Sequence, residues 1–136
     1  MFNAKKTLAC LMATIALASA FAVNTFAYSM GGASVGNKGT GAIWNAPNEA
    51  HTLYGETDGK SGYNNVGIRV RIAYTDAYGY SRNAYSPSSS SYTTDTDGYV
   101  SDSVKISSSA TPVTGYGYYK IDDTTNSSSH AWNFGR

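Results

Sequence analysis

The sequence predicts an all-β protein, on three observations. Beyond residue 27 the chain holds all twelve of its tyrosines but a single leucine, Leu53. Aromatic and β-branched residues fit the pleated, half-buried surface of a sheet, whereas leucine is a strong helix former. All fourteen glycines and all three prolines also lie beyond residue 27, where they divide the chain into short segments. The clearest of these segments alternates large apolar residues with small or charged ones, the period of a half-buried strand.

Residues 1–27 have the composition of a secretory signal peptide. A basic start at Lys5 and Lys6 precedes an uncharged apolar run, and a small-residue cleavage pattern ends at Ala27. We expect this segment to be helical and to be removed, although an earlier alanine pattern offers a second cleavage site. The mature protein would then begin at Tyr28 and be secreted to the extracellular space.

The mature chain of about 109 residues has the size of one domain. Its glycine-rich start, residues 28–41, lacks periodicity and is interpreted either as a flexible leader or as a ragged edge strand. Residues 42–136 are then a single β-sandwich domain. The only cysteine, Cys10, lies in the signal peptide, so the mature chain can form no disulfide of its own. No apolar run of membrane-spanning length remains in the mature chain.

The first strands of this domain are short. Ala42–Ala46 and Thr52–Glu56 flank the turn dipeptide Pro47-Asn48 and are predicted to form two strands, with a polar loop at residues 57–62 after them. The clearest strand, Asn65–Thr75, comes next, with a strict period of two. Its predicted core face carries Val66, Ile68, Val70, Ile72 and Tyr74, and its predicted outer face carries Gly67, Arg69, Arg71 and Ala73.

Turn signals organise the second half of the domain. Gly79 is placed for a left-handed turn residue, so Tyr80–Tyr85 is predicted to return as a hairpin partner of the preceding strand. The dipeptide Asp97-Gly98 is a further hairpin signal, and it predicts that Tyr92–Asp95 pairs with Tyr99–Ile106. The remaining predicted elements are a strand at Val113–Ile121, a polar loop at residues 122–129 and a closing strand at His130–Phe134.

The spacing of these elements bears on the architecture. Seven or eight short strands, about ten residues apart, are typical of a sandwich or a small barrel. We predict a small immunoglobulin-like antiparallel β-sandwich, with a small β-barrel as the alternative. Sequence pattern alone separates the two poorly, because both alternate core-facing and solvent-facing residues along every strand.

Catalytic chemistry is not indicated by the sequence. Nucleophilic hydrolysis needs a serine or cysteine beside a base that a third group orients. No serine lies in a Gly-x-Ser-x-Gly elbow, and His130 shares strand parity with Trp132, which favours a partly buried edge residue over a base. We therefore predict a protein that is not an enzyme and that carries no cofactor.

The charge of the mature chain is close to neutral. Two of the ten Lys and Arg residues lie in the signal peptide, which leaves eight against nine Asp and Glu, a net charge of −1. The basic residues are dispersed along the chain rather than gathered in a stripe. This distribution argues against nucleic acid and against an anionic membrane surface as partners.

A metal site is not predicted, although Asp95, Asp97 and Asp102 form a weak calcium candidate. Oxygen donors at alternate positions before a glycine turn suit a hard cation, but Val104 stands where the EF-hand pattern requires a bidentate glutamate. Asp102 also has the strand parity of core residues, where a lone carboxylate is costly. The preferred explanation is a β-bulge near Ser101 that turns Asp102 outward, with capping of backbone N–H groups and an edge strand as alternatives.

Aromatic and basic residues are the remaining candidates for a functional surface. Tyr116, Tyr118 and Lys120 share one face of their predicted strand, where glycines beside the tyrosines leave the rings uncrowded. Exposed tyrosines on a sheet can stack on sugar rings or form a protein contact patch. Arg69 and Arg71 are predicted to form a second patch. The two tryptophans of the mature chain, Trp44 and Trp132, are predicted to anchor the core.

The sequence thus favours a small secreted, non-enzymatic bacterial β-sandwich protein that acts by surface contact. The contacted partner would be cell-wall glycan, a matrix component or another copy of the chain. The alternative is a secreted bacteriocin-like antimicrobial or toxin-like effector, because small size, secretion and the absence of an enzyme motif fit it equally well. The sequence leaves the ligand, the target and the oligomeric state open.

Overall fold

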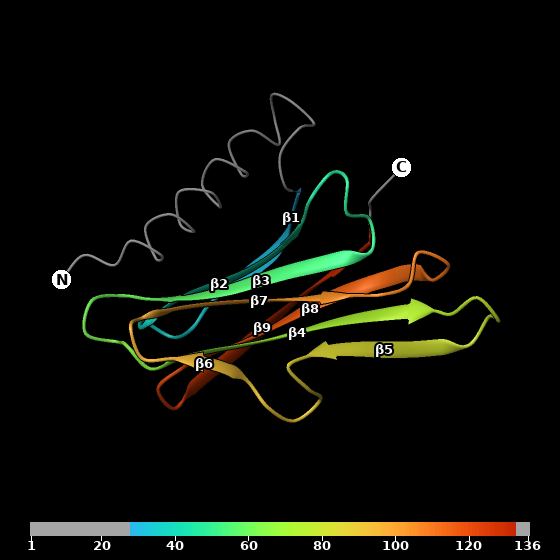
Figure 1. Cartoon of the computed structure of the whole chain (residues 1–136). Helices are drawn as coiled ribbons and strands as arrows, with labels where there is room; N and C mark the ends of the chain where they lie inside the picture. The colour runs from blue at the N-terminus through green and yellow to red at the C-terminus, as the bar shows by residue number, and fades with distance from the viewer. Residues whose placement is uncertain (1–27, 133–136) are drawn as a thin grey trace.

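The computed structural model describes residues 28–132 and places them in two stacked antiparallel sheets (Figure 1). The predicted signal peptide lies outside the described residues. Within residues 28–132 there is no helix long and apolar enough to cross a membrane. The strands are β1 (Tyr28–Ser34), β2 (Gly39–Asn45), β3 (Thr52–Gly59), β4 (Val66–Thr75), β5 (Ser81–Ser86), β6 (Thr93–Asp95), β7 (Tyr99–Lys105), β8 (Thr111–Ile121) and β9 (Thr124–Ala131).

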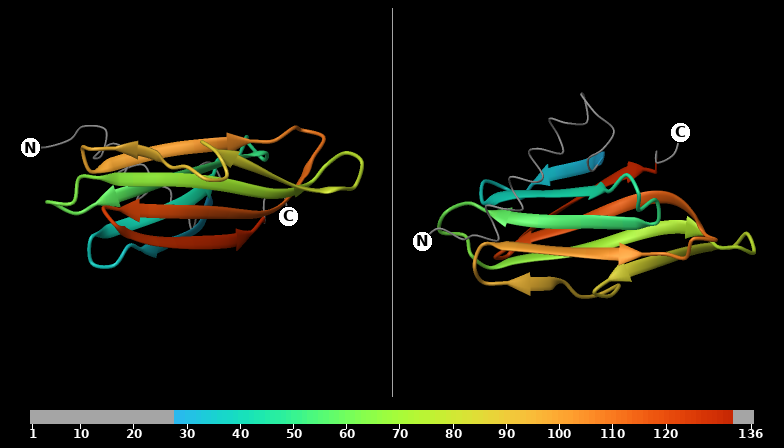
Figure 2. Two further views of the ribbon diagram at one scale, coloured as in Figure 1. Left: turned by 90° about the horizontal axis from the view of Figure 1, so that it is seen from below. Right: turned by 45° about the horizontal axis from the view of Figure 1, so that its top comes forward.

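The two sheets confirm the predicted sandwich. The first sheet has the strand order β1-β2-β3-β7, and the second has the order β5-β4-β8-β9, with β6 also paired to β4 (Figure 2). The sheets are not closed into a barrel by strand pairing within residues 28–132. Immunoglobulin constant domains have the sheet orders ABED and CFG. Here β1, β2 and β3 are successive neighbours in one sheet, so the connections between strands differ from that pattern.

The core lies between the sheets, and β4 supplies its centre. Ile68, Val70 and Ile72 have no exposed surface, while Arg69 and Arg71 alternate with them on the outer side of the sheet. The predicted register of this strand is therefore confirmed. The other fully enclosed apolar side chains are Val35 of the β1–β2 connection and Ile43, Leu53, Tyr119 and Ile121 of the strands.

The glycines of β8 make room for the core rather than for the outer face. Gly115 faces Leu53 and Met30, whose methyl groups would lie 3.1 Å from a Cβ added at that position. Gly117 faces Tyr119, and a Cβ there would overlap its hydroxyl group. The Tyr119 ring lies across the sandwich against Gly41 of β2, at a place where even a methyl group has no space.

Residues 28–41 are part of the sandwich and not a flexible leader. They form β1 and the start of β2, and β1 is the edge strand of the first sheet. The ragged-edge alternative describes this segment better, because the pairing of β1 with β2 shifts register between Ser29 and Gly31. A glycine-rich strand is acceptable at this edge, where few side chains have to be packed.

The predicted hairpin across Asp97-Gly98 is wrong, although the turn itself is present. Gly98 has the expected positive φ of 88°. The strands on either side belong to different sheets, because β6 pairs with β4 and β7 pairs with β3. The backbone of Gly98 bonds instead to Asn64 and Gly59 around the β3–β4 connection, so the turn carries the chain from one sheet to the other.

The end of the chain also differs from the prediction. Most of the predicted polar loop at residues 122–129 is strand β9, joined to β8 by a tight turn at Asp122, whose φ is +52°. Polar residues are tolerated here because β9 is an edge strand with one face in solvent. Near the start of β8, Val113 is half exposed at a β-bulge.

Candidate functional site

The outer face of the second sheet brings together all five residues predicted as binding residues. In the pairing of β4 with β8, Arg69 stands opposite Tyr118 and Arg71 stands opposite Tyr116. The predicted tyrosine patch and the predicted arginine patch are therefore one surface. We call it the Arg–Tyr face, and it comprises Arg69, Arg71, Tyr85, Tyr92, Tyr116, Tyr118 and Lys120.

The centre of the Arg–Tyr face is built from stacked cations and rings. The Cζ atom of Arg71 lies 3.7 Å from the Tyr116 ring centroid, and that of Arg69 lies 4.4 Å from the Tyr118 ring centroid. The two tyrosine rings are nearly parallel, with an interplanar angle of 11° and centroids 6.5 Å apart. Each ring thus has a guanidinium against one of its faces, an attractive cation–π arrangement.

Two tyrosines that sequence reasoning missed flank this centre. Tyr85 of β5 stands opposite Arg71 in the β4–β5 ladder, with a ring centroid 5.9 Å from the Cζ atom. Tyr92 lies just before β6, with its ring centroid 5.0 Å from Arg69 Cζ and 5.8 Å from Lys120 Nζ. The position of Tyr85 follows from the hairpin register, which the sequence could have supplied. The position of Tyr92 depends on where β6 joins the sheet.

The arginines of this face are only partly satisfied by protein groups. Their Nε atoms are buried and have no hydrogen-bond partner among the described residues. Arg69 Nη1 donates a long hydrogen bond of 3.3 Å to the Ser89 carbonyl. Partial burial acts to lower the pKa of Arg71, but its hydrogen bond with Tyr85 and the nearby phenol groups together raise it above the usual value. The guanidinium therefore stays charged.

A row of hydroxyl groups continues the Arg–Tyr face onto β9. Thr125, Ser127 and Ser129 are exposed and pair with Lys120, Tyr118 and Tyr116 respectively. The opposite side of β9 faces inward, where the Ser128 hydroxyl lies 2.6 Å from the Tyr119 hydroxyl. Small polar side chains beside large rings leave the outer surface open along this edge. We call Thr125, Ser127 and Ser129 the β9 hydroxyl row.

Acidic side chains are absent from the strands that carry this face. The sequences of β4, β5, β8 and β9 contain no Asp or Glu. Asp95 of β6 pairs with the inward-facing Val66 and accepts hydrogen bonds from the backbone N–H groups of residues 96 and 97. Residues 28–136 carry a net charge of −1, yet every charged side chain on β4 and β8 is basic.

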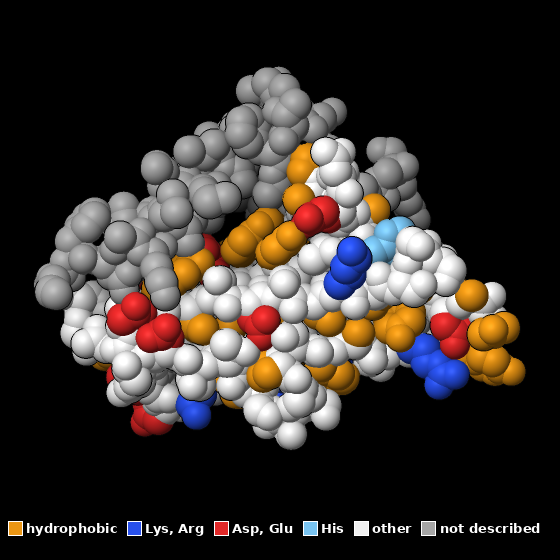
Figure 3. Space-filling view, in the orientation of Figure 1, with side chains coloured by type: hydrophobic (Ala, Val, Ile, Leu, Met, Phe, Trp, Pro, Cys, Tyr) orange, Lys and Arg blue, Asp and Glu red, His pale blue; other side chains and the backbone are white. Residues whose placement is uncertain are grey.

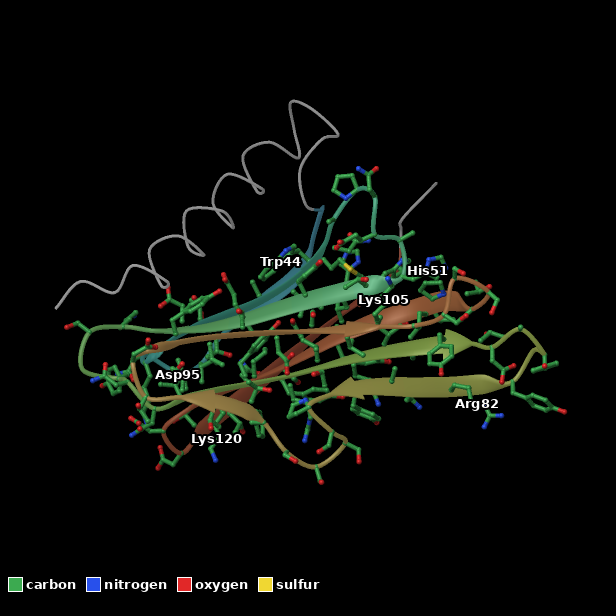
Figure 4. The ribbon with its side chains drawn as sticks, viewed as in Figure 1. Trp44, His51, Arg82, Asp95, Lys105 and Lys120 are labelled. Carbon is green, nitrogen blue, oxygen red and sulfur yellow. The ribbon has the colours of Figure 1, made fainter. Side chains whose placement is uncertain are left out.

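The outer face of the first sheet has a different chemistry. Trp44 and Tyr54 stack at a centroid distance of 5.9 Å, and the Tyr54 hydroxyl donates to the Glu49 carboxylate. Nearby, burial raises the pKa of Glu56 to about 7, opposed by a hydrogen bond from Tyr99. Figure 4 shows Trp44 and Lys120 on opposite sides of the sandwich.

The two predicted core tryptophans therefore behave differently. Trp44 is only partly buried, and its alternation with the enclosed Ile43 places it on the outer side of β2. The prediction of a core anchor is wrong for Trp44, because successive residues of a strand point to opposite faces and Ile43 is the one that points inward. Trp132, which follows β9, is buried in the core as predicted.

A second exposed aromatic feature lies at the tip of the β4–β5 turn (Figure 3). Tyr78 and Tyr80 are 86% and 63% exposed, the two most exposed large apolar side chains among the described residues. Asp76 organises the turn by accepting hydrogen bonds from the N–H groups of both tyrosines and from Arg82 Nε at 3.0 Å. These interactions lower the pKa of Asp76 below its usual value, the Tyr80 backbone bond first among them.

The calcium candidate is not assembled as a site. No group of three metal-ligating side chains occurs in residues 28–132. Asp95 and Asp97 each accept hydrogen bonds from backbone N–H groups of their own turn. Asp102 lies on β7 of the other sheet, and its carboxylate accepts hydrogen bonds from side chains outside this turn. The aspartates of this segment serve turn geometry, the ordinary role of Asp before glycine.

Asp102 links the two sheets at their open edge. Its Oδ2 atom accepts hydrogen bonds from the Ser86 hydroxyl of β5 at 2.8 Å and from the Thr93 hydroxyl of β6 at 2.5 Å, and its Oδ1 atom accepts from the Ser103 N–H group. The β3–β7 ladder is regular through Ser101, so the predicted bulge is wrong. The edge-strand alternative is correct, since β7 is an edge strand.

We expect Asp102→Ala to lower the free energy of unfolding by about 1–3 kcal/mol, because two hydroxyls at the sheet edge lose their charged acceptor. Urea unfolding followed by circular dichroism measures the change. Ser103→Ala is the matched control, since its exposed side chain points away from the core and should matter little. Equal stability of the two variants would contradict a linking role for Asp102.

Each of the two histidines contacts a backbone carbonyl group through one ring nitrogen. His51 Nε2 lies 3.1 Å from the Ala110 carbonyl, and His130 Nδ1 lies 2.7 Å from the Ala131 carbonyl. A carbonyl oxygen only accepts, so the contacting nitrogen of each ring must carry a proton. Neither contact supplies the serine–histidine geometry that nucleophilic hydrolysis needs.

Comparisons with known proteins leave the family open. No protein-family model and no curated protein matches the chain. Among solved structures, Ptr ToxA of Pyrenophora tritici-repentis, an RGD-containing host-selective toxin, aligns with 69% of this chain and 82% of its own at 11% identity and a TM-score of 0.35. A Northeast Structural Genomics Consortium target solved by X-ray methods aligns with 77% of this chain and 81% of its own at 10% identity and a TM-score of 0.27. Likeness at this level carries no conclusion about function.

Proposed function

We propose that this protein is a secreted, non-enzymatic binding module that acts by surface contact through the Arg–Tyr face, with extracellular glycan of the cell wall as the partner. The observation that carries the proposal is the cross-strand register of β4 and β8, which places Arg69 and Arg71 directly against Tyr118 and Tyr116. The layout of residues 1–27 supports secretion.

The composition of this face favours a binding role over a purely structural one. Arginine and tyrosine are enriched at binding hot spots, because they offer large contact areas together with directional donors. Both arginines are held against the sheet by ring contacts instead of extending freely into water. Ordering a long side chain when a ligand binds costs conformational entropy. Because these arginines are already ordered in the free protein, less of that cost remains to be met on binding.

The surrounding structure favours contact over catalysis as well. The face stands on the outer side of a sheet whose inner side is filled by the core. A surface of this kind suits an extended ligand that is contacted along its length. A nucleophile with an oriented base, by contrast, requires a third positioned group beside the pair.

The test uses mature protein beginning at Tyr28 and purified cell walls in a sedimentation binding assay. We expect Tyr116→Ala with Tyr118→Ala to weaken binding by about tenfold or more, since hot-spot residues contribute at least 1–2 kcal/mol each. The fold should survive, because both rings lie on the outer face and are partly exposed.

Tyr78→Ala with Tyr80→Ala is the matched control, because it also removes two tyrosines, but from the exposed β4–β5 turn outside the Arg–Tyr face. Wall binding that both double variants retain would refute the proposed use of the Arg–Tyr face. The antimicrobial alternative would be favoured if the purified protein killed related bacteria and the Tyr78→Ala, Tyr80→Ala variant did not. Tyr78 and Tyr80 are chosen because their rings are the most exposed among the described residues.

A further inference from the structure

The cations of the Arg–Tyr face are arranged in a line. Arg69 and Arg71 occupy alternate positions of β4, and Lys120 of β8 stands opposite Gly67, one step further along the same direction. Alternate residues of a strand are about 7 Å apart. Three successive rows of the face therefore each carry one cation, at a regular spacing along the strands.

Two carboxylates in the flanking turns are paired with cations outside this line. The four main strands of the sheet contain no Asp or Glu. In the turn beyond β8, Asp123 forms an ion pair of 2.7 Å with Lys38. In the turn between β4 and β5, Asp76 pairs with Arg82. The positive potential over the face therefore remains available to an anionic partner.

The tyrosine rings of this face are poorly placed for flat stacking on a neutral sugar. A sugar ring stacks by covering the π-face of an aromatic ring. One face each of Tyr116 and Tyr118 is covered by a guanidinium, at centroid distances of 3.7 and 4.4 Å. The surface offers cationic N–H groups and phenol hydroxyls instead of an open aromatic platform.

From these features we propose that the Arg–Tyr face binds an acidic polysaccharide that runs along β4 and β8, with its carboxylates against Arg69, Arg71 and Lys120. This inference rests on the proposed function and names its ligand class. Planar guanidinium groups match carboxylates by paired N–H donors. The β9 hydroxyl row lies beside the same rows of the sheet and supplies partners for the sugar hydroxyls.

A polymer of phosphate esters is the competing polyanion. Arginine also binds phosphate, but a polyol phosphate presents few hydroxyl groups to the β9 hydroxyl row. The combination of a cation line and a parallel row of exposed hydroxyls fits a chain that alternates acid groups with sugar hydroxyls. The face therefore favours the acidic polysaccharide.

The test measures binding of the mature protein to polygalacturonate by isothermal titration calorimetry. The matched ligand is methyl-esterified polygalacturonate, which keeps the sugar backbone and lacks the charge. We expect the affinity for the ester to be at least about tenfold lower than the affinity for polygalacturonate. Raising the salt concentration from about 50 to about 500 mM should also weaken polygalacturonate binding strongly. Poly(glycerol phosphate) is the third probe.

The variants separate specific recognition from net charge. Arg69→Gln with Arg71→Gln should lose about tenfold or more in affinity for polygalacturonate, and Arg69→Lys with Arg71→Lys should recover only part of it, because lysine lacks the planar fork. Arg82→Gln removes one positive charge at the exposed β4–β5 turn and should leave binding unchanged. Thermal unfolding confirms that each variant is folded.

Three results would overturn the inference. These are equal binding of the ester, tighter binding of poly(glycerol phosphate), and equal losses for Arg82→Gln and the double arginine variant. If cell walls still bind in a manner that depends on Tyr116 and Tyr118, the proposed function stands and only the ligand class fails. If neither walls nor polygalacturonate bind, both proposals fail.

Discussion

Gly41→Ala should destabilise the domain by about 3 kcal/mol or more, the upper range for overpacking a core. A Cβ at this position of β2 would overlap the ring of Tyr119. That ring is fully enclosed, and its hydroxyl lies 2.6 Å from the Ser128 hydroxyl, so it cannot move without breaking other contacts. Urea unfolding monitored by circular dichroism gives the free energy of unfolding.

The matched control for this variant is Gly31→Ala on the neighbouring strand β1. A Cβ there would meet the Ser128 hydroxyl at 3.5 Å, which is ordinary contact, and the change should be small. Combining Gly41→Ala with Tyr119→Leu should cost less than the sum of the two changes, because the smaller side chain leaves room for the methyl group. Additive losses would mean that the two residues do not share the same space.

Ile72→Ala is expected to cost about 2–5 kcal/mol, the range for truncation of an enclosed aliphatic side chain. Ile72 has no exposed surface and lies in the centre of the core between the sheets. Its neighbour Arg71 points to the outer face, so Arg71→Ala should change stability by about 1 kcal/mol or less, through loss of ring contacts.

The contrast between these adjacent positions tests the strand register directly. A shift by one residue would exchange the two faces and reverse the order of the two losses. Thermal and urea unfolding of both variants, with Val70→Ala as a second core position, distinguishes the registers. A larger loss for Arg71→Ala than for Ile72→Ala would show that the placement of β4 is wrong.

Much of the candidate site could be predicted from local alternation. The period of two along β4 and β8 identifies Arg69 and Arg71 on one strand, and Tyr116 and Tyr118 on the other, as outer-face residues. Alternation describes one strand at a time. It does not reveal that β4 and β8 are neighbours in the sheet, because β5, β6 and β7 lie between them in the sequence. The sequence therefore predicted two patches where the structure has one.

The wrong predictions share a physical origin. Asp97-Gly98 does form a turn, as its residue types predict. The residues of a turn determine that the chain reverses, but not which strands the flanking segments pair with. Residues 124–129 of β9 have the polar composition of a loop, which is why a loop was predicted there, yet an edge strand needs inward contacts on one side only. The role of Gly117 was likewise hidden, since the ring that it accommodates crosses the interior to reach Gly41.

The position of β4 and β8 inside their sheet has a consequence for the rigidity of the Arg–Tyr face. Each of these strands is hydrogen-bonded on both sides, β4 by β8 and by β5 with β6, and β8 by β4 and β9. Backbone amides in such central strands open rarely and should be among the last in the domain to exchange their hydrogens with solvent. The proposed binding surface, which stands on these two strands, should therefore be rigid in the free protein. Association would then require no loop to become ordered, and affinity would depend on how well the partner fits a fixed template.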